Sequence, residues 1–315
     1  MEKKTNSYSN KFKINFSYNE TAYTAVKKLL KELALIMHRN EKGIIEDIGD
    51  EFLHDYRVSI RKSRSILTQL KKIYDKYLTD DLTDKFSFIA NSTNQLRDLD
   101  VFLMNKKFYL DLLNKKNRDL LEVFFHKLEL KRRTAYKEVV KDILSQEHRN
   151  FIKKLNVFLK TDNEKQKDIN SDLYIKDMVT EQINIRYSKI FKPGSKILTS
   201  SPDKKFHRLR IQFKKLRYLI ELFSNLYLSE SLTVLIEELK EIQDHLGKIN
   251  DYSIQHSMVV QYLKPLDDSS NKNVMYRNML LDLTKAIDEE KKNEIILFVK
   301  TFKSFIKTKN RILFK

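Results

Sequence analysis

Residues 53–67 read LHDYRVSIRKSRSIL, and residues 206–223 read FHRLRIQFKKLRYLIELF. In both stretches a histidine is followed by cations three, seven, eight and ten positions later, and the two histidines lie 153 positions apart. The same offset superposes three further pairs without a gap: Asp50 on Asp203, Tyr74 on Tyr227, and Asp98 on Asp251. Chance seldom repeats such a spacing. We therefore predict an internal duplication in which each half contributes one basic helix.

Composition predicts an all-α protein built from long helices. The 315 residues include only four Gly and three Pro, whereas the pair usually makes up ~12% of a chain. Because both residue types interrupt helices, their scarcity favours long uninterrupted ones. Apolar residues such as Val26, Leu29 and Leu33 recur at helical spacing. Helices are expected over about residues 18–39, 50–77, 82–108, 117–147, 149–159, 174–191, 203–227, 231–263 and 272–310, with a loop over 40–49.

The apolar positions also keep their phase between the two halves: Leu82 matches Leu235, and Phe86 matches Leu239. Each half should therefore form a bundle of about four helices, and the two bundles should pack around a pseudo-two-fold axis with a basic cavity between them. The expected divisions are a basic N-terminal tail over 1–16, a first repeat over 17–160, a polar linker over 161–173 and a second repeat over 174–312.

The net charge of +18 and the pI near 9.6 favour a polyanionic partner, such as nucleic acid, an acidic membrane surface or a phosphate polymer. A merely soluble basic protein is the alternative. The absence of cysteine excludes disulfides, thiolate metal sites and cysteine nucleophiles. The N-terminus lacks the apolar core of a signal peptide, and no stretch approaches the ~18 apolar residues of a membrane span. A cytoplasmic protein is expected.

On a helical wheel the cations of each motif fall in one sector, which borders the apolar core face. That face includes Tyr56 and Ile60 in the first copy and Phe213 and Leu216 in the second. Such a stripe lines a groove or seam between helices. Like charges one turn apart cost a few tenths of a kcal/mol per exposed pair, and no acid is interleaved on that face. A ligand that supplies negative charge explains this arrangement better than a solvated face does. Histidine in such a field should be neutral at pH 7. A bound polyanion would raise its pKa, so affinity should increase as the pH falls towards 6.

The two helices resemble the signatures of the CHAD family, the conserved histidine α-helical domain. Residues 96–101 (LRDLDV) and 246–251 (LGKIND) are similar to that family's Leu-Arg-Asp-x-Asp-Val and Leu-Gly-x-Leu-Asn-Asp elements. The resemblance covers about residues 17–312. It implies two pseudo-symmetric four-helix bundles and a basic cavity or pore that binds inorganic polyphosphate. By position, the ligand contacts would be His54, Arg57, Arg61, Lys62, Arg64, His207, Arg210, Lys214, Lys215 and Arg217.

The chain departs from the family pattern in a few places. Lys214 stands where the first copy has Arg61, and Ser63 and Gln212 are local deviations. Family members are often fused to a triphosphatase-type domain. No such domain is expected here, because no Glu-x-Glu-x-Lys stretch lies near the N-terminus. A polyphosphate-metabolising enzyme is a further candidate partner.

Other polar residues have secondary roles in this hypothesis. The additional basic contacts would be Arg97, Lys131, Arg132 and Arg133. Asp98 and Asp251 are expected to orient arginines of the stripe through charge-assisted hydrogen bonds. The alternative is that these two acids and Asp100 hold a divalent cation beside phosphate. No metal site, cofactor or catalytic residue is predicted, because the remaining histidines lack ligand spacing.

The leading hypothesis is a non-catalytic polyphosphate-binding protein. One alternative is a phosphohydrolase or phosphotransfer enzyme that uses His54 or His207 as phospho-acceptor or general acid, although no acidic metal cluster or phosphate-binding glycine loop accompanies them. A second is a nucleic-acid-binding protein, although the stripe lacks interleaved aromatic residues for base stacking. A helical scaffold for a protein partner is the third.

Overall fold

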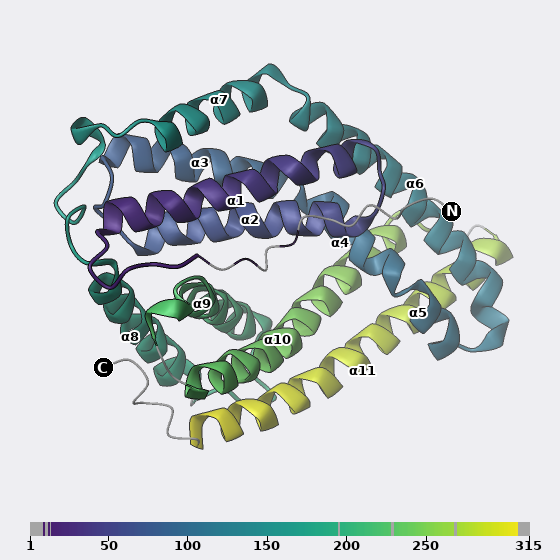
Figure 1. The fold of residues 1–315 in the computed structure, drawn as a ribbon. Helices are drawn as coiled ribbons and strands as arrows, with labels where there is room; N and C mark the ends of the chain where they lie inside the picture. Colours follow the sequence, from purple (N-terminus) through teal and green to yellow (C-terminus); the bar gives the residue numbers. More distant parts are fainter. Residues whose placement is uncertain are drawn as a thin grey trace, which may run out of the picture.

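The structure is a computed structural model that describes residues 9, 12, 14–194, 196–227, 230–267 and 270–307. It is all-α, as predicted (Figure 1). The helices are α1 (Ala22–Ile45), α2 (Asp50–Gln69), α3 (Lys76–Ser92), α4 (Asn94–Met104), α5 (Lys106–Leu112), α6 (Arg118–Ile143), α7 (Gln146–Lys160), α8 (Ile175–Gly194), α9 (Asp203–Leu222), α10 (Glu230–Leu263) and α11 (Asn271–Lys307). In the described ranges, β-structure is limited to two isolated bridges, Thr21–Tyr174 and Tyr74–Lys167.

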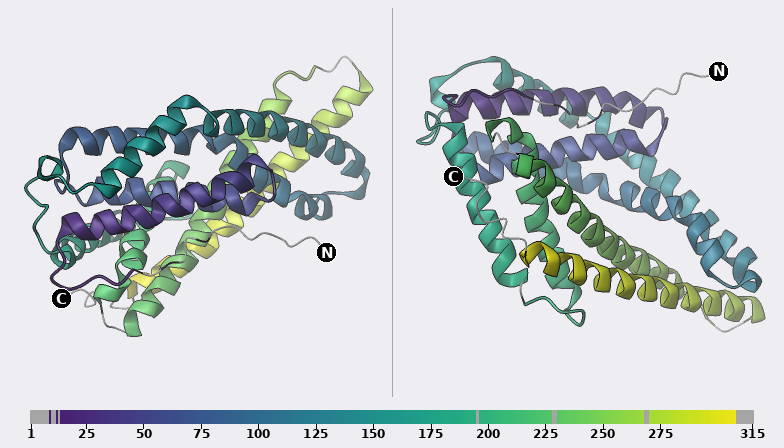
Figure 2. Two further views of the ribbon diagram at one scale, coloured as in Figure 1. Left: turned by 45° about the horizontal axis from the view of Figure 1, so that its top comes forward. Right: turned by 60° about the horizontal axis from the view of Figure 1, so that its bottom comes forward.

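The helices form two groups that follow each other in the chain. Helices α1, α2, α3 and α7 lie on one side of the molecule, and α8 to α11 lie on the other (Figures 1 and 2). The two halves of the chain touch where α2 packs on α9, α4 on α10, α6 on α11 and α1 on α8. The motif helices α2 and α9 are therefore direct neighbours. None of the helices in the described part of the chain is long and apolar enough to cross a membrane.

Several features support the predicted duplication. Helices α2 and α9 begin 153 positions apart, as do α1 and α8, and α6 and α11. The backbone N–H of Ala22 donates to the Leu173 carbonyl (2.8 Å), and the N–H of Ile175 donates to the Glu20 carbonyl (3.0 Å). Residues 20 and 22 correspond to residues 173 and 175 at the 153-residue offset, so exchanging the equivalent residues turns each bond into the other. A local two-fold axis produces this relation. The duplication itself stays a prediction.

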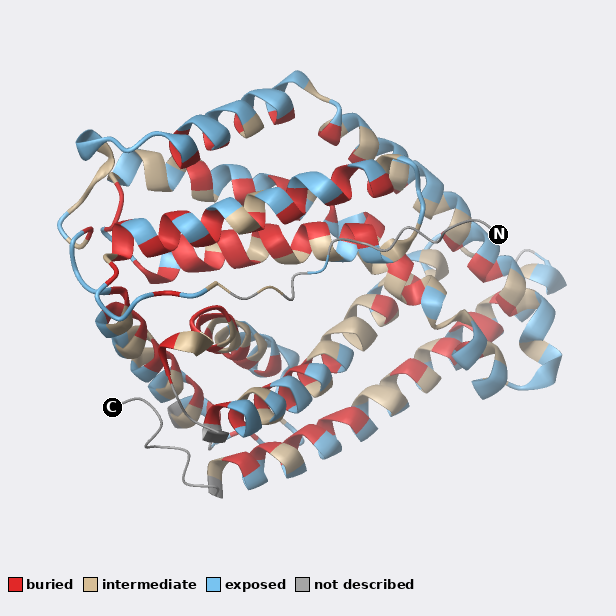
Figure 3. Cartoon of the chain, in the orientation of Figure 1, coloured by how far each residue is buried: buried red, intermediate tan, exposed pale blue. Residues whose placement is uncertain are grey.

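The apolar faces of the helices form the core. Buried residues are dense along α1 and α2 (Figure 3). Tyr56 and Ile60 of α2 are fully buried, as are Phe213 and Leu216 of α9, so the core face inferred from the helical wheel is confirmed. Burying a large side chain of this kind contributes about 1.5–3 kcal/mol.

Several helix boundaries differ from the prediction. Helix α9 ends at Leu222 instead of residue 227, and α1 continues through residues 40–45, where a loop was expected. Gly43, in this continuation, faces Phe52 of α2. A Cβ at this glycine would lie 2.0 Å from the ring of Phe52, so only glycine permits the close approach. Helix α2 ends at Gln69 instead of residue 77, and the Asp75 carboxylate caps α3 by accepting from the Leu78 N–H (3.0 Å).

The helix expected over 82–108 is divided into α3, α4 and α5. At the break between α3 and α4, Arg57 of α2 donates to the Ala90 carbonyl (2.7 Å). In an unbroken helix this carbonyl would accept from the N–H of Asn94 instead. The Thr93 hydroxyl also donates to the Ile89 carbonyl (2.9 Å). Side chains therefore take up the backbone acceptors at this junction.

The stretch between α7 and α8, predicted as a linker, is fixed against the α2–α3 turn. The N–H of Asp168 donates to the Ile73 carbonyl (3.1 Å), and the N–H of Asn170 donates to the Lys72 carbonyl (2.7 Å). At the start of this stretch, the Lys27 amine forms an ion pair with Asp162 (2.9 Å). The connection therefore positions α8 relative to the first half of the chain.

Candidate functional site

The predicted basic residues lie along the contact between α2 and α9, here called the α2–α9 seam. The side-chain amide of Gln69 on α2 donates to the Lys215 carbonyl on α9 (3.2 Å), which fixes the two helices together. Because the helices are neighbours, cations from both halves of the chain come close to one another.

Arg61, Arg210 and Lys214 form the centre of this arrangement and are called the central cation group. The pKa of Lys214 is well below its usual value, first because of burial and then because of Arg210 and Arg61. Burial also lowers the pKa of Arg210, and the charge of Arg61 adds to that effect. Within the described residues, no ion pair joins any of the three to an acid, and the buried Nε of Arg210 has no hydrogen-bond partner. The group therefore holds positive charge without a direct counterion.

Two acids lie beside the central cation group, one from each half. Burial raises the pKa of both Asp98 and Asp251, and the charge of Asp251 adds to the rise at Asp98. Arg210 and Arg97 oppose the shift at both acids. The expected hydrogen bonds to stripe arginines are not present in the described ranges. Asp251 instead accepts from the Asn250 side chain at 3.5 Å. The acids thus act on the group through their charge.

Arg57 has a different position from its neighbours in the stripe. Its side chain is only 5% exposed. Its guanidinium donates to the Ala90 carbonyl, to the Thr93 hydroxyl and to Asn94 Oδ1 (2.7 Å). Burial lowers its pKa to about 9, and Arg61 contributes. Arg57 therefore holds the α3–α4 junction, and most of its donors are already used.

The two motif histidines differ in their surroundings. The His54 side chain reaches solvent, yet the protein around it lowers its pKa to about 4, mainly by desolvation and then through Arg97 and Arg61. His54 is therefore neutral at pH 7, as expected. His207 is exposed, and its Nδ1 lies 3.2 Å from Asn250 Oδ1.

The other motif cations lie farther along the seam. Lys62 is buried, with its amine 5.8 Å from the centre of the Phe12 ring. Arg217 Nε lies 3.1 Å from a carboxylate oxygen of Glu221. Arg64 donates to the Ser87 hydroxyl (3.3 Å). Together with Lys215, they extend the basic stripe beyond the central cation group.

The four additional basic residues have separate surroundings. Arg132 donates to Asp47 through two nitrogens (2.7 and 2.9 Å) and to Asp100 through Nε (2.7 Å), so its charge is neutralised inside the protein. Arg97 pairs with Asp50 (3.0 Å) and lies near His54. Lys131 approaches Gln261 of α10 (3.5 Å), and Arg133 is exposed.

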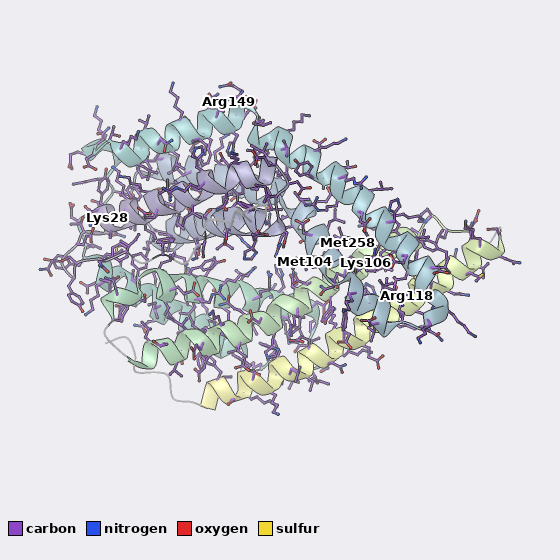
Figure 4. The ribbon with its side chains drawn as sticks, turned by 45° about the vertical axis from the view of Figure 1, so that its right-hand side comes forward. Lys28, Met104, Lys106, Arg118, Arg149 and Met258 are labelled. Carbon is purple, nitrogen blue, oxygen red and sulfur yellow. The ribbon has the colours of Figure 1, made fainter. Side chains whose placement is uncertain are left out.

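Many other cations lie on the periphery. In Figure 4, Arg149 lies at the outer edge of α7, and Lys28 and Arg118 lie towards opposite ends of the molecule. Sequence reasoning also missed Arg186 on α8, which lies beside the seam. The 153-residue offset pairs Arg186 with Leu33, so the repeat gave no signal for it.

Three pockets, of about 570, 580 and 390 Å³, are lined by residues outside the ten predicted contacts. The basic cavity between the halves therefore stays a prediction. The described ranges contain no group of three or more His, Asp or Glu side chains arranged to hold a metal ion.

The geometry can be compared with known proteins. The sequence pattern of the CHAD domain matches residues 28–260. The chain belongs to the CHAD family. Its structure is similar to the crystal structure of the CHAD domain from the plant Ricinus communis, with a TM-score of 0.73 and 18% identity over 94% of this chain and 96% of that one. It is also similar to PptA from Streptomyces chartreusis, with a TM-score of 0.68 and 13% identity over 90% of this chain and 99% of that one. At these identities the likeness concerns the CHAD fold. No curated protein sequence gave a match.

Proposed function

We propose that this CHAD protein binds inorganic polyphosphate along the α2–α9 seam without transforming it. One observation carries the proposal: the positive charges of Arg61, Arg210 and Lys214, on two neighbouring helices, act on one another, and no acid forms an ion pair with them in the described ranges. Desolvated like charges are unfavourable in the free protein, and a bound polyanion would relieve that cost.

The chemistry of the group fits a polymer of phosphates. The planar guanidinium groups of Arg61 and Arg210 match two oxygens of a phosphate, and the Lys214 amine acts as a point charge. A linear chain with a negative charge on every unit can contact cations from both halves at once. The family resemblance implies the same ligand.

The residues of the seam would have different roles. Arg61, Arg210 and Lys214 would contact phosphate, and neutral His54 would offer a hydrogen bond at the edge. Asp98 and Asp251 would limit the excess positive charge in the free protein. Arg57 would act indirectly, because its guanidinium already holds the α3–α4 junction.

The proposal is tested by titrating the protein with polyphosphate of defined length. Arg61→Gln and Lys214→Gln should each weaken binding about tenfold or more, because a charge-assisted contact contributes about 1.5–3 kcal/mol. Each should also reduce the slope of log affinity against log salt by about 0.7–0.9, by extension from nucleic acids. Lys153→Gln on the exposed side of α7 removes the same charge elsewhere and is the control.

Unchanged affinity in both seam variants would contradict the proposal. The enzymatic alternative is tested in parallel by incubating the protein with polyphosphate and Mg²⁺ or Mn²⁺. Released phosphate that depends on His54 or His207 would support that alternative instead.

A further inference from the structure

In the described part of the chain, the hydrogen-bond partners of Arg186 on α8 are neutral groups. Its Nε donates to Gln69 Oε1 (2.8 Å), and its Nη1 donates to Gln212 Oε1 (3.4 Å). Gln69 is itself fixed, because its amide nitrogen donates to the Ser65 hydroxyl (2.9 Å) and to the Lys215 carbonyl (3.2 Å). The network thus joins α8 to both motif helices and orients the guanidinium of Arg186, a residue that is only 9% exposed.

Other cations gather around this network. The pKa of Lys215 is lowered by burial and then by four cations: Arg186, Arg64, Lys189 and Lys71. We call these five residues the α8 cation group. Across the described ranges, none of the five forms an ion pair with an acid. Lys71 and Lys189 are exposed, so the group opens to solvent.

Two other arginines with structural contacts have different surroundings. Arg132 is bound by two carboxylates, Asp47 and Asp100, which raise its pKa and neutralise its charge. Arg57 is bound by neutral oxygens, but both of its terminal nitrogens donate to them. Burial lowers the pKa of Arg186, and in the described part of the chain its Nε and Nη1 donate to amide oxygens. Arg186 therefore keeps its charge, and its Nη2 is left for an anion from outside.

Lys214 and Lys215 connect this group to the proposed site. They are adjacent on α9, and the main charge interactions of Lys214 are with Arg210 and Arg61, whereas those of Lys215 are with Arg186 and Arg64. Adjacent residues on a helix project about 100° apart. The two cation groups therefore lie next to each other along the α2–α9 seam and face different directions.

We infer that the α8 cation group is a second phosphate-binding site, which takes the part of the same polymer that continues past the central cation group. This inference rests on the proposed function. A short phosphate chain occupies one group, whereas a longer chain occupies both. Once one group has bound the chain, the other group binds a second part of the same polymer molecule. Because this second contact is intramolecular, it raises the affinity for long chains. Binding should therefore depend on chain length.

The test uses a double variant, Lys71→Gln/Lys189→Gln, because both side chains are exposed and their loss should leave the fold intact. Binding of tripolyphosphate and of a long polyphosphate is measured at several salt concentrations. The long polymer should bind about tenfold more weakly, and its salt slope should fall by about 1.4–1.8 for two lost contacts. Tripolyphosphate binding should stay unchanged. Lys153→Gln/Lys154→Gln on α7 is the charge-matched control, and its binding of both ligands should match the wild type.

Arg186→Gln tests the oriented guanidinium directly, with thermal unfolding as a check that the fold is kept. It should lower the affinity for the long polymer selectively. If the wild type and the double variant bind the long polymer equally well, the inference of a second site is wrong and the proposed function stands. If tripolyphosphate binding falls equally, the two groups are one site and the inference is overturned. A wild type that binds neither ligand refutes the proposed function itself.

Discussion

Replacing Arg57 with Ala is expected to destabilise the fold and not only to weaken ligand binding. The substitution removes three donated hydrogen bonds at the α3–α4 junction, to Ala90, Thr93 and Asn94. The Ala90 carbonyl and the Thr93 hydroxyl are buried, and each keeps one other bond, so losing the charged donor costs about 1–2 kcal/mol for each. Asn94 is exposed and can bond to water.

Together the two groups cost about 2–4 kcal/mol, and the removal of a desolvated cation offsets part of this, so the net loss should be about 1–3 kcal/mol. For a chain of this size, about 2 °C per kcal/mol gives a fall in Tm of about 2–6 °C. Thermal unfolding followed by circular dichroism measures it. Arg61→Ala is the control, since among the described residues Arg61 donates one hydrogen bond, from Nε to the Arg57 carbonyl (3.2 Å). The Tm of this variant should stay within about 1 °C of the wild type. Equal Tm values for wild type and Arg57→Ala would refute this reasoning.

Two further predictions concern pH. A bound polyanion raises the lowered pKa of Lys214, so affinity should be highest below the free-state pKa and should fall as the pH rises towards the bound-state pKa. Lys214→Arg should flatten this alkaline decline in binding titrations; an unchanged profile would exclude Lys214 as its source. The same argument places the contribution of His54 at acid pH. Affinity should rise as the pH falls from the pKa of His54 in the complex towards its pKa of about 4 in the free protein. His54→Gln should reduce this acid rise in affinity. Any rise that remains in the variant comes from protonation of Asp98 and Asp251, whose pKa values are raised.

The pattern of apolar residues predicted much of the fold. The scarcity of Gly and Pro indicated long helices, and the helical wheel placed Tyr56 and Phe213 correctly on the buried faces. These inferences succeed because periodicity within a helix directly reflects which side is buried. The close approach of α1 and α2 at Gly43 was missed, since it depends on Phe52, a residue on another helix.

The role of each cation could not be read from its angle on the helix alone. Arg57 and Arg61 are one turn apart in the same stripe, yet the first enters the α3–α4 junction and the second belongs to the central cation group. Arg132 seemed a candidate ligand contact until Asp47 and Asp100, distant in sequence, were found to bind it. Partners contributed by remote segments decide whether a cation is available.

The proposed seam has a consequence for the kind of polymer that fits. The reciprocal backbone bonds relate the segments before α1 and α8 by a half-turn, but the cations differ between the halves, because Arg57 is held at the α3–α4 junction and Arg186 corresponds to Leu33. A nucleic acid has a 5′-to-3′ direction and would therefore meet different contacts in its two orientations. A chain of identical phosphates has no such polarity, so it could be taken up in both senses with equal affinity.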